Sequence, residues 1–329
     1  MRCLDLFAGV GGIRLGMEGA GFHTVFSNDF NKWSRITFDA NHSEPKMTFG
    51  DVTKIDETTL PEFDVLVGGF PCQAFSSIGA RKGFEDKTKG TLFFDMLRIM
   101  KHHKPRMALM ENVRGLINHE KGETFKTILE SLEELGYHVH WKLLKSTTHC
   151  NIPQMRTRVF IVSFRDKEDY DRFEFPNEIP LTTSAWDLIE LGRKDLDDKL
   201  WIRGATLEKI ERENGVATLD EGKFYFYRYD RGLNYIRTPD QCPTLVATIG
   251  SSQTPFILDG GRLRHLAGRE LFRLQGFPED FILPPEVPHT QIHFQAGNSV
   301  TVPLVKRIAE KMMEACEVKQ KSRAKAKAV

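Results

Sequence analysis

The strongest constraint on the fold is an alternation of short apolar segments with longer amphipathic ones along residues 1–165. This pattern predicts βαβ units and therefore a doubly wound, mostly parallel α/β sheet. Strands are expected in RCLDLFAG, HTVFSND, the segment ending in GDVT, FDVLVGGF, RMALMENV and RVFIVSF. Helices are expected in GIRLGMEGAG, LFFDMLRIMKHH and TFKTILESLEELGY, the last with Gly136 as its stop.

The pattern changes after about residue 176. FEFPNEIPLTT is rich in proline, and the chain through residue 258 is irregular, with a dense aromatic and basic run, KFYFYRYDRGLNYIR. This part predicts a second, smaller domain. The C-terminal stretch QAGNSVTVPLVKRIAEKMMEAC predicts a loop followed by a long helix that packs back on the sheet.

Composition narrows the class of protein. The 329 residues are 40% hydrophobic and 28% charged, with no apolar run long enough to cross a membrane and no signal-peptide pattern, so an intracellular soluble protein is expected. The net charge of +1 excludes a polycation, and the basic tail KQKSRAKAKAV is expected to be disordered and solvated. Five cysteines lie far apart without a CxxC pair, which argues against a disulfide framework and a zinc site, so no metal is expected.

Several chemistry-bearing residues follow predicted strands, and doubly wound sheets bind ligands at the carboxyl ends of their strands. The turn in DLFAGVGG lets a ligand approach the backbone, although its spacing is not GxGxxG. Asp29 ends the second strand, where a carboxylate can accept bonds from ribose hydroxyls or cap the next helix. Asp51 can bond an exocyclic amine or serve as a turn residue. Together they predict an adenosine-containing cofactor.

Cys72 in GGFPCQAFS is a core thiol, a metal or disulfide partner, or a nucleophile. Pro71 fixes its own φ and so orients the backbone around the thiol. Glu111 in ENV, together with Arg156 and Arg158, which the spacing places on one face of a strand, completes a plausible set for covalent catalysis. Taken singly, each residue also has a purely structural explanation: a thiol in the core, a carboxylate on the surface, and solvated arginines.

The motifs DLFAGVGG, GGFPCQAFS, ENVRG, QMRTRVF, RLQGFP and GNSV, in this order, resemble those of the DNA (cytosine-5)-methyltransferases. The resemblance covers residue 2 to about 310 and leaves mainly 179–258 without a motif. It implies a Rossmann-like catalytic domain, residues 1–178 plus 297–329, that binds S-adenosylmethionine. Residues 179–296 would form the target-recognition domain and hinge.

The resemblance also implies a mechanism in which the target cytosine is flipped out of the duplex. Cys72 matches the nucleophile that attacks C6, and Glu111 matches the glutamate at N3. Arg158 would hold O2, with Arg156 supporting the flipped nucleotide or its phosphate. C5 would then receive the methyl group of S-adenosylmethionine, and loss of the C5 proton would release Cys72.

Cofactor contacts carry over in the same way. Phe7 and the glycine turn would surround the methionine part and the adenine, Asp29 would bind the ribose, Phe30 would stack on the adenine, and Asp51 would bond its amine. The implied cofactor residues are Phe7, Ala8, Gly9, Val10, Gly11, Gly12, Asp29, Phe30, Asp51, Val52, Pro71, Asn298 and Ser299. The expected contacts to double-stranded DNA are Gln73, Ser76, Arg228, Arg231 and Thr244, although the aromatic-rich strands could equally be domain core.

The expected setting is a cytoplasmic, nucleoid-associated monomer beside a cognate restriction endonuclease. The chain departs from the family at Ala267-Gly268, where threonine-proline is usual, and at Phe30, where some members carry tryptophan. A tRNA cytosine-5 methyltransferase of the same fold is the main alternative. A nicotinamide oxidoreductase would leave Cys72, Glu111 and Arg158 unexplained, and an inactive DNA-binding relative would not need them.

Overall fold

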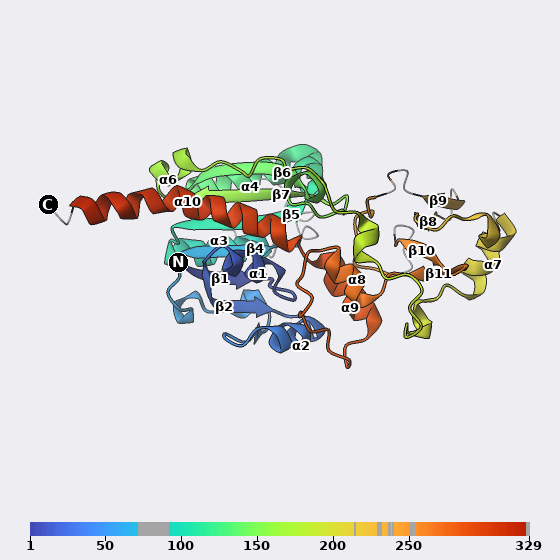
Figure 1. Cartoon of the computed structure of the whole chain (residues 1–329). Helices are drawn as coiled ribbons and strands as arrows, with labels where there is room; N and C mark the ends of the chain where they lie inside the picture. Colours follow the sequence, from blue (N-terminus) through green and yellow to red (C-terminus); the bar gives the residue numbers. More distant parts are fainter. Residues whose placement is uncertain are drawn as a thin grey trace. The chain divides into compact units, whose positions relative to one another are not determined.

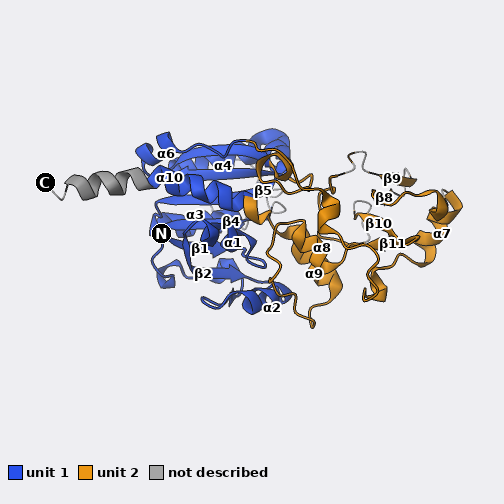
Figure 2. Cartoon of the chain, viewed as in Figure 1, with its two compact units in different colours: residues 1–144, 157–177, 304–329 blue, residues 145–156, 178–303 orange. Residues whose placement is uncertain are grey.

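The computed structural model describes residues 1–71, 92–213, 215–228, 232–235, 238, 240–249 and 254–326 (Figure 1). The chain forms two compact units, coloured separately in Figure 2. Unit 1 comprises residues 1–144, 157–177 and 304–329, and unit 2 comprises residues 145–156 and 178–303. The functional division predicted above, 1–178 plus 297–329 against 179–296, stays a proposal.

A sheet with seven described strands forms the centre of unit 1, in the order β3-β2-β1-β4-β5-β7-β6. Strands β3, β2, β1, β4 and β5 pair in parallel, whereas β7 pairs with β5 in the antiparallel direction. The strands are β1 Arg2–Leu6, β2 His23–Asp29, β3 Thr48–Phe49, β4 Val65–Gly69, β5 Met107–Val113, β6 His138–Lys145 and β7 Thr157–Phe164. The predicted mostly parallel α/β fold is confirmed.

Helices cover the sheet because its strands are apolar on both faces. All but the last residue of β4 and of β5 are buried, as expected for central strands of a covered parallel sheet. Leu4 and Leu6 of β1 pack in one core cluster with Phe93 and Met96 of α3 and with Ile128 of α4. The helices described for this part of the chain are α1 Gly12–Gly19, α2 Lys32–Asn41, α3 Leu92–His103, α4 Glu123–Glu134, α6 Lys167–Arg172 and α10 Val302–Ala326.

The sequence predicted most of these elements, with one error of direction. HTVFSND and LFFDMLRIMKHH form β2 and α3 over the expected residues, and Gly136 follows α4 with a φ of 83°. Strand β6 was not predicted. The alternation implied a parallel β7, but only the four-residue helix α5 (Ser146–His149) lies between β6 and β7. A parallel crossover needs a longer connection, usually a full helix.

Two predictions for the C-terminal part were wrong. Residues 295–298 of the expected loop form the last turn of helix α9 (His289–Asn298), which begins after Pro288. The basic tail was expected to be disordered, but helix α10 continues to Ala326. Alanine, lysine, arginine and glutamine all have high helix propensity, which explains why the helix continues into the basic segment.

Unit 2 contains a smaller antiparallel sheet, in the order β11-β10-β8-β9. Tyr225 and Tyr227 of β8 pack with Phe256 and Leu258 of β10 and with Ile210 of α7, so part of the aromatic run is domain core. The strands are β8 Phe224–Arg228, β9 Gly232–Tyr235, β10 Phe256–Asp259 and β11 Arg262–His265, and the helices are α5, α7 Gly204–Glu213, α8 Gly268–Arg273 and α9. Among the described helices, none combines the length and apolar composition that a bilayer crossing requires.

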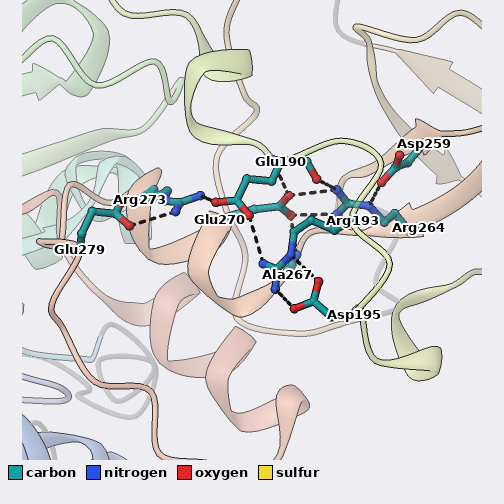
Figure 3. Close-up of polar contacts among 9 residues, drawn as sticks. All are labelled: Glu190, Arg193, Asp195, Asp259, Arg264, Ala267, Glu270, Arg273 and Glu279. Atoms are coloured by element: carbon teal, nitrogen blue, oxygen red, sulfur yellow. Dashed lines mark hydrogen bonds and ion pairs between the residues drawn. The ribbon is translucent and has the colours of Figure 1, made fainter.

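A buried ionic cluster fastens the end of this sheet to helix α8. Figure 3 shows Arg264 between two carboxylates: its Nε donates to Asp259 at 2.6 Å, and its terminal nitrogens donate to Glu270 at 2.8 and 2.9 Å. The carboxylate of Glu270 also accepts the N–H groups of Ala267 and Glu190. Every charge in the cluster therefore has partners, as buried charges require. Glu270 bonds the amide at the start of α8, although the usual threonine is absent there.

Candidate active site

The turn after β1 brings the first strand and the second together at their carboxyl ends. Ala8 N–H donates to the carbonyl of Asn28 at 3.0 Å, and Gly9 N–H donates to a carboxylate oxygen of Asp29 at 2.9 Å. Phe7 and Gly9 have positive φ values of 56° and 55°. The turn is thus held against Asp29, which the sequence had linked to it only by spacing.

Asp29 does not cap the following helix. The side chain of Asn31 caps α2, while the second carboxylate oxygen of Asp29 accepts the N–H of Asn31 at 2.8 Å. The capping alternative for Asp29 is therefore wrong. Burial raises the pKa of Asp29, and the N–H groups of Asn31, Gly9 and Phe30 oppose that rise.

A cavity of about 310 Å³ lies at this sheet edge, within the size range of small-molecule sites. Phe30 is 67% exposed, so its ring can contact a ligand without any change in the packing of the core. The cavity contains five of the predicted cofactor residues, but not the glycines of the turn. Its lining residues are Phe7, Asn28, Asp29, Phe30, Gly50, Asp51, Val52, Thr53 and Leu92.

Asp51 lies on the exposed rim of the cavity and also caps a short 3-10 helix (Val52–Lys54). Its carboxylate accepts the N–H of Thr53 at 3.0 Å. Bonds from the backbone and the hydroxyl of Thr53 lower the pKa of Asp51. A carboxylate that stays ionised remains available as an acceptor, so the turn role and a ligand role are compatible.

Sequence reasoning missed Asn28, Gly50, Thr53 and Leu92 in this cavity. Asn28 is 1% exposed, and its side-chain amide donates to the carbonyls of Thr48 (2.8 Å) and Gly50 (3.0 Å). It thereby fixes the segment that runs from β3 to Asp51. The only available signal was its place beside Asp29 in FSND.

Glu111 and Arg158, the predicted catalytic residues, lie close together because β7 is antiparallel to β5. Arg158 is the second residue of β7 and pairs with Val113, the last residue of β5. Its Nε lies 3.0 Å from an oxygen of Glu111, and both side chains are largely buried. Burial lowers the pKa of Arg158, and the Glu111 carboxylate opposes the shift. Had β7 been parallel, its first residues would lie at the opposite edge of the sheet.

Two contacts shape the surroundings of Glu111 at the end of β5. A Cβ at Gly69 would come 3.2 Å from a carboxylate oxygen of Glu111, so the glycine leaves room for that side chain. Asn112 donates from its side-chain amide to the carbonyl of Phe70 at 2.7 Å. Phe70 is two residues before Cys72, so ENV holds the chain that leads to the predicted nucleophile.

Arg156 is not placed as predicted. Strand β7 begins at Thr157, so Arg156 does not share a strand face with Arg158. Its side chain is 3% exposed and donates to the carbonyls of Leu245 and Gly297 in unit 2. The backbone before β7 is irregular rather than extended, so the Arg156 side chain does not follow the alternation of the strand and lies in the interior.

The remaining predicted residues fall into three groups. Thr244 donates its hydroxyl to the carbonyl of Met155 at 2.7 Å, while Asn298 ends α9 and Ser299 follows it. Arg228 ends β8, and its side chain lies outside the described part. Cys72, Gln73, Ser76 and Arg231 lie outside the described residues. Within the described ranges, no group of three or more His, Cys, Asp or Glu is arranged to hold a metal ion.

Fold and site together define a class: a Rossmann-like enzyme with a ligand cavity and a buried acid–arginine pair at the carboxyl edge of its sheet. The family model for C-5 cytosine-specific DNA methylase matches residues 1–314. The chain therefore belongs to that family, and it is a DNA (cytosine-5)-methyltransferase. The predicted family and activity are confirmed.

Curated relatives agree over nearly the full length. The chain is 42% identical over 315 residues to Type II methyltransferase M.Bsp6I of Bacillus sp. (strain RFL6), covering 94% of this chain and 98% of that protein. It is 39% identical over 328 residues to Type II methyltransferase M1.ScrFI of Lactococcus lactis subsp. cremoris, covering 97% and 80%. These relatives favour DNA over the tRNA alternative.

Solved structures show the same fold. A Spodoptera frugiperda DNMT2 mutant matches with a TM-score of 0.72 at 18% identity, covering 95% of this chain and 99% of that chain. A putative DNA modification methyltransferase encoded within a prophage of E. coli matches with a TM-score of 0.71 at 20% identity, covering 96% and 99%. At these identities the likeness supports the fold alone.

Proposed function

We propose that the chain transfers a methyl group from S-adenosylmethionine to C5 of one cytosine within a specific sequence of double-stranded DNA. The observation that carries this proposal is the Glu111–Arg158 pair, 3.0 Å apart at the sheet edge to which Asn112 fastens the chain leading to Cys72. A carboxyl and a guanidinium side by side match two neighbouring atoms of a cytosine ring, N3 and O2. The pair lies in the same unit as the cavity.

The cavity fits S-adenosylmethionine by its chemistry. Phe7 and Phe30 offer ring faces for a purine, and Asp29 and Asp51 offer acceptors for hydroxyl and amino groups. Asp29 is already oriented by two backbone N–H groups, so binding would not require it to reorder. S-adenosylmethionine, when bound, supplies the methyl group. Asn298 and Ser299 are proposed cofactor contacts on the resemblance alone.

The protein's own residues would carry the chemistry as follows. Cys72, as a thiolate, forms a bond to C6 of a flipped cytosine, and the ring electron pair moves toward C5 and N3. Glu111 holds the proton or hydrogen bond at N3, while Arg158 bonds O2. The electron pair at C5 would then take the methyl group, and the sulfur would keep the pair of the broken S–C bond and leave as S-adenosylhomocysteine. Loss of the C5 proton to a base would return an electron pair to the ring and expel Cys72 as thiolate. Adding and later removing the thiol divides one difficult substitution into easier steps.

The proposed setting follows the curated relatives, which are named as type II methyltransferases. The chain would work in the cytoplasm, bound to the nucleoid as a monomer, and protect the site of a cognate restriction endonuclease. Residues 179–296 would select the sequence. The proposed DNA contacts are Gln73, Ser76, Arg228, Arg231 and Thr244.

The test measures methyl transfer from labelled S-adenosylmethionine to three substrates. The first is duplex DNA without methylated cytosine, the second is total tRNA, and the third is DNA that this protein has already methylated. We expect label only in the first, at C5 of cytosine, with one sequence context when the products are sequenced. Label in tRNA at a greater rate than in DNA would contradict the proposal. Label on a base other than cytosine would contradict it as well.

A further inference from the structure

Two segments of unit 2 that are far apart in sequence run side by side, residues 153–156 and 241–247. Cys242 N–H donates to the carbonyl of Pro153 at 2.7 Å, and Met155 N–H donates to the carbonyl of Cys242 at 2.8 Å. Thr244 then donates its hydroxyl to Met155. The first segment leads directly into Thr157 and the catalytic Arg158, and the second carries a predicted DNA contact.

Gln154 joins these segments from inside. Its side chain is 0% exposed, and its amide oxygen accepts the N–H of Leu245 at 3.1 Å. The amide nitrogen donates to the carbonyl of Leu274 at 2.8 Å and to the side-chain oxygen of Gln275 at 3.2 Å. Both ends of this amide are therefore in use, which leaves it no capacity to contact DNA.

Arg156 binds the other side of the same segment. Its guanidinium donates to the carbonyls of Leu245 (3.2 Å), Gly297 (3.1 Å) and Ser299. The backbones are close here: a Cβ at Gly297 would lie 2.4 Å from the carbonyl carbon of Val246. One guanidinium fork thus ties the 241–247 segment to the end of α9. A lysine ammonium on a different stem cannot reproduce that geometry.

We propose that Gln154 and Arg156 are positioning residues for DNA sequence selectivity. Both side chains are buried. Gln154 bonds the N–H of Leu245 and Arg156 bonds its carbonyl, so together they fix the neighbouring Thr244 relative to the backbone that leads into β7. This inference rests on the proposed function. Functional groups need support that holds them to a fraction of an ångström, and buried hydrogen-bonded side chains provide it.

The experiment uses the full chain and a pool of DNA duplexes with a random insert. Sequencing after cytosine conversion gives the ratio of methylation rates at the preferred site and at sites with one base changed. Arg156→Lys and Gln154→Met test the two sides of the grip separately, so either variant is decisive if the other fails to fold. Arg106→Lys is the control, because Arg106 lies in unit 1 and donates to the carboxylate of Asp169 and, like Arg156, to a backbone carbonyl, that of Cys316.

We expect each test variant to lose selectivity by about tenfold, the size of one base-pair contact, at temperatures where melting curves show it folded. Arg106→Lys should lower the melting temperature and keep the wild-type ratio. Unchanged selectivity in a folded test variant would overturn the inference, and so would an equal loss in Arg106→Lys. A wild-type protein that methylates no DNA would instead contradict the proposed function.

Discussion

Substituting Glu111 by glutamine tests the proposed catalytic pair, because glutamine keeps the size and shape of the glutamate side chain. The Glu111 and Arg158 side chains are 11% and 15% exposed, so the ion pair is only weakly screened by water. Glutamine retains an oxygen that can accept the Nε–H of Arg158, but it removes the negative charge. It also cannot deliver a proton to N3 of cytosine.

The two expected magnitudes differ, which makes the test informative. Removing one partner of a buried ion pair costs about 3–5 kcal/mol, and a hydrogen bond from Arg158 to the new amide oxygen would return about 1.5–3 kcal/mol. We therefore expect a loss of at most about 3.5 kcal/mol in the free energy of unfolding. Loss of a general acid should slow methylation by about 10²–10⁴-fold. DNA affinity should stay within about tenfold, because phosphate contacts supply most of it.

The assay is single-turnover methylation of one duplex, with thermal melting and DNA binding measured on the same samples. Glu18→Gln is the control, since Glu18 forms a 2.9 Å ion pair with Arg14 within helix α1 of unit 1. It should lower stability and leave the methylation rate nearly unchanged. Near wild-type methylation by Glu111→Gln would refute the assigned role, as would an equal loss of rate in Glu18→Gln.

Three further outcomes are expected. Asp29→Ala should weaken S-adenosylmethionine binding by about 1.5–3 kcal/mol in calorimetry; it should also lower the melting temperature without cofactor, because the carboxylate accepts two backbone N–H groups. Unchanged cofactor affinity would exclude the ribose role. Burial lowers the pKa of His42 and of His293 to about 4. Between pH 6.5 and 4 the unfolded chain therefore binds protons that the folded chain does not, so the melting temperature should fall as the pH is lowered through that range. Equal melting temperatures at pH 6.5 and 4.5 would contradict this. Replacing residues 179–258 by the matching segment of a relative should move methylation to the relative's site, and methylation at the original site would defeat that division of labour.

The sequence predicted the first half of the fold because each strand there is a short apolar segment bounded by turn residues. HTVFSND is a short apolar segment between turn residues, and it became β2 without a change of boundary. The direction of β7 could not be predicted from RVFIVSF, since a strand's own residues do not specify its neighbour's direction. The short connection over 146–156 was the usable signal.

The residues that line the cavity were more predictable than the contacts of Arg156. Phe7, Asp29 and Asp51 follow successive strands, and topology alone brings such residues to one edge. Arg156 shows the limit of that reasoning, because its partners come from residues about 90 and 140 positions later in the chain. Spacing two residues from Arg158 implied a shared strand face, whereas those distant carbonyls decide where the side chain lies.

The central claim is that Cys72 attacks the target cytosine, and trapping that bond tests it most directly. In duplex DNA with 5-fluorocytosine at the methylated position, C5 carries fluorine in place of the proton that must leave. With S-adenosylmethionine present, wild-type protein should form a complex that survives denaturation, and peptide mass spectrometry should map the attached nucleotide to Cys72. Cys72→Ser should form none, while binding the same DNA. A stable complex formed by Cys72→Ser, or a nucleotide mapped to another residue, would contradict the account.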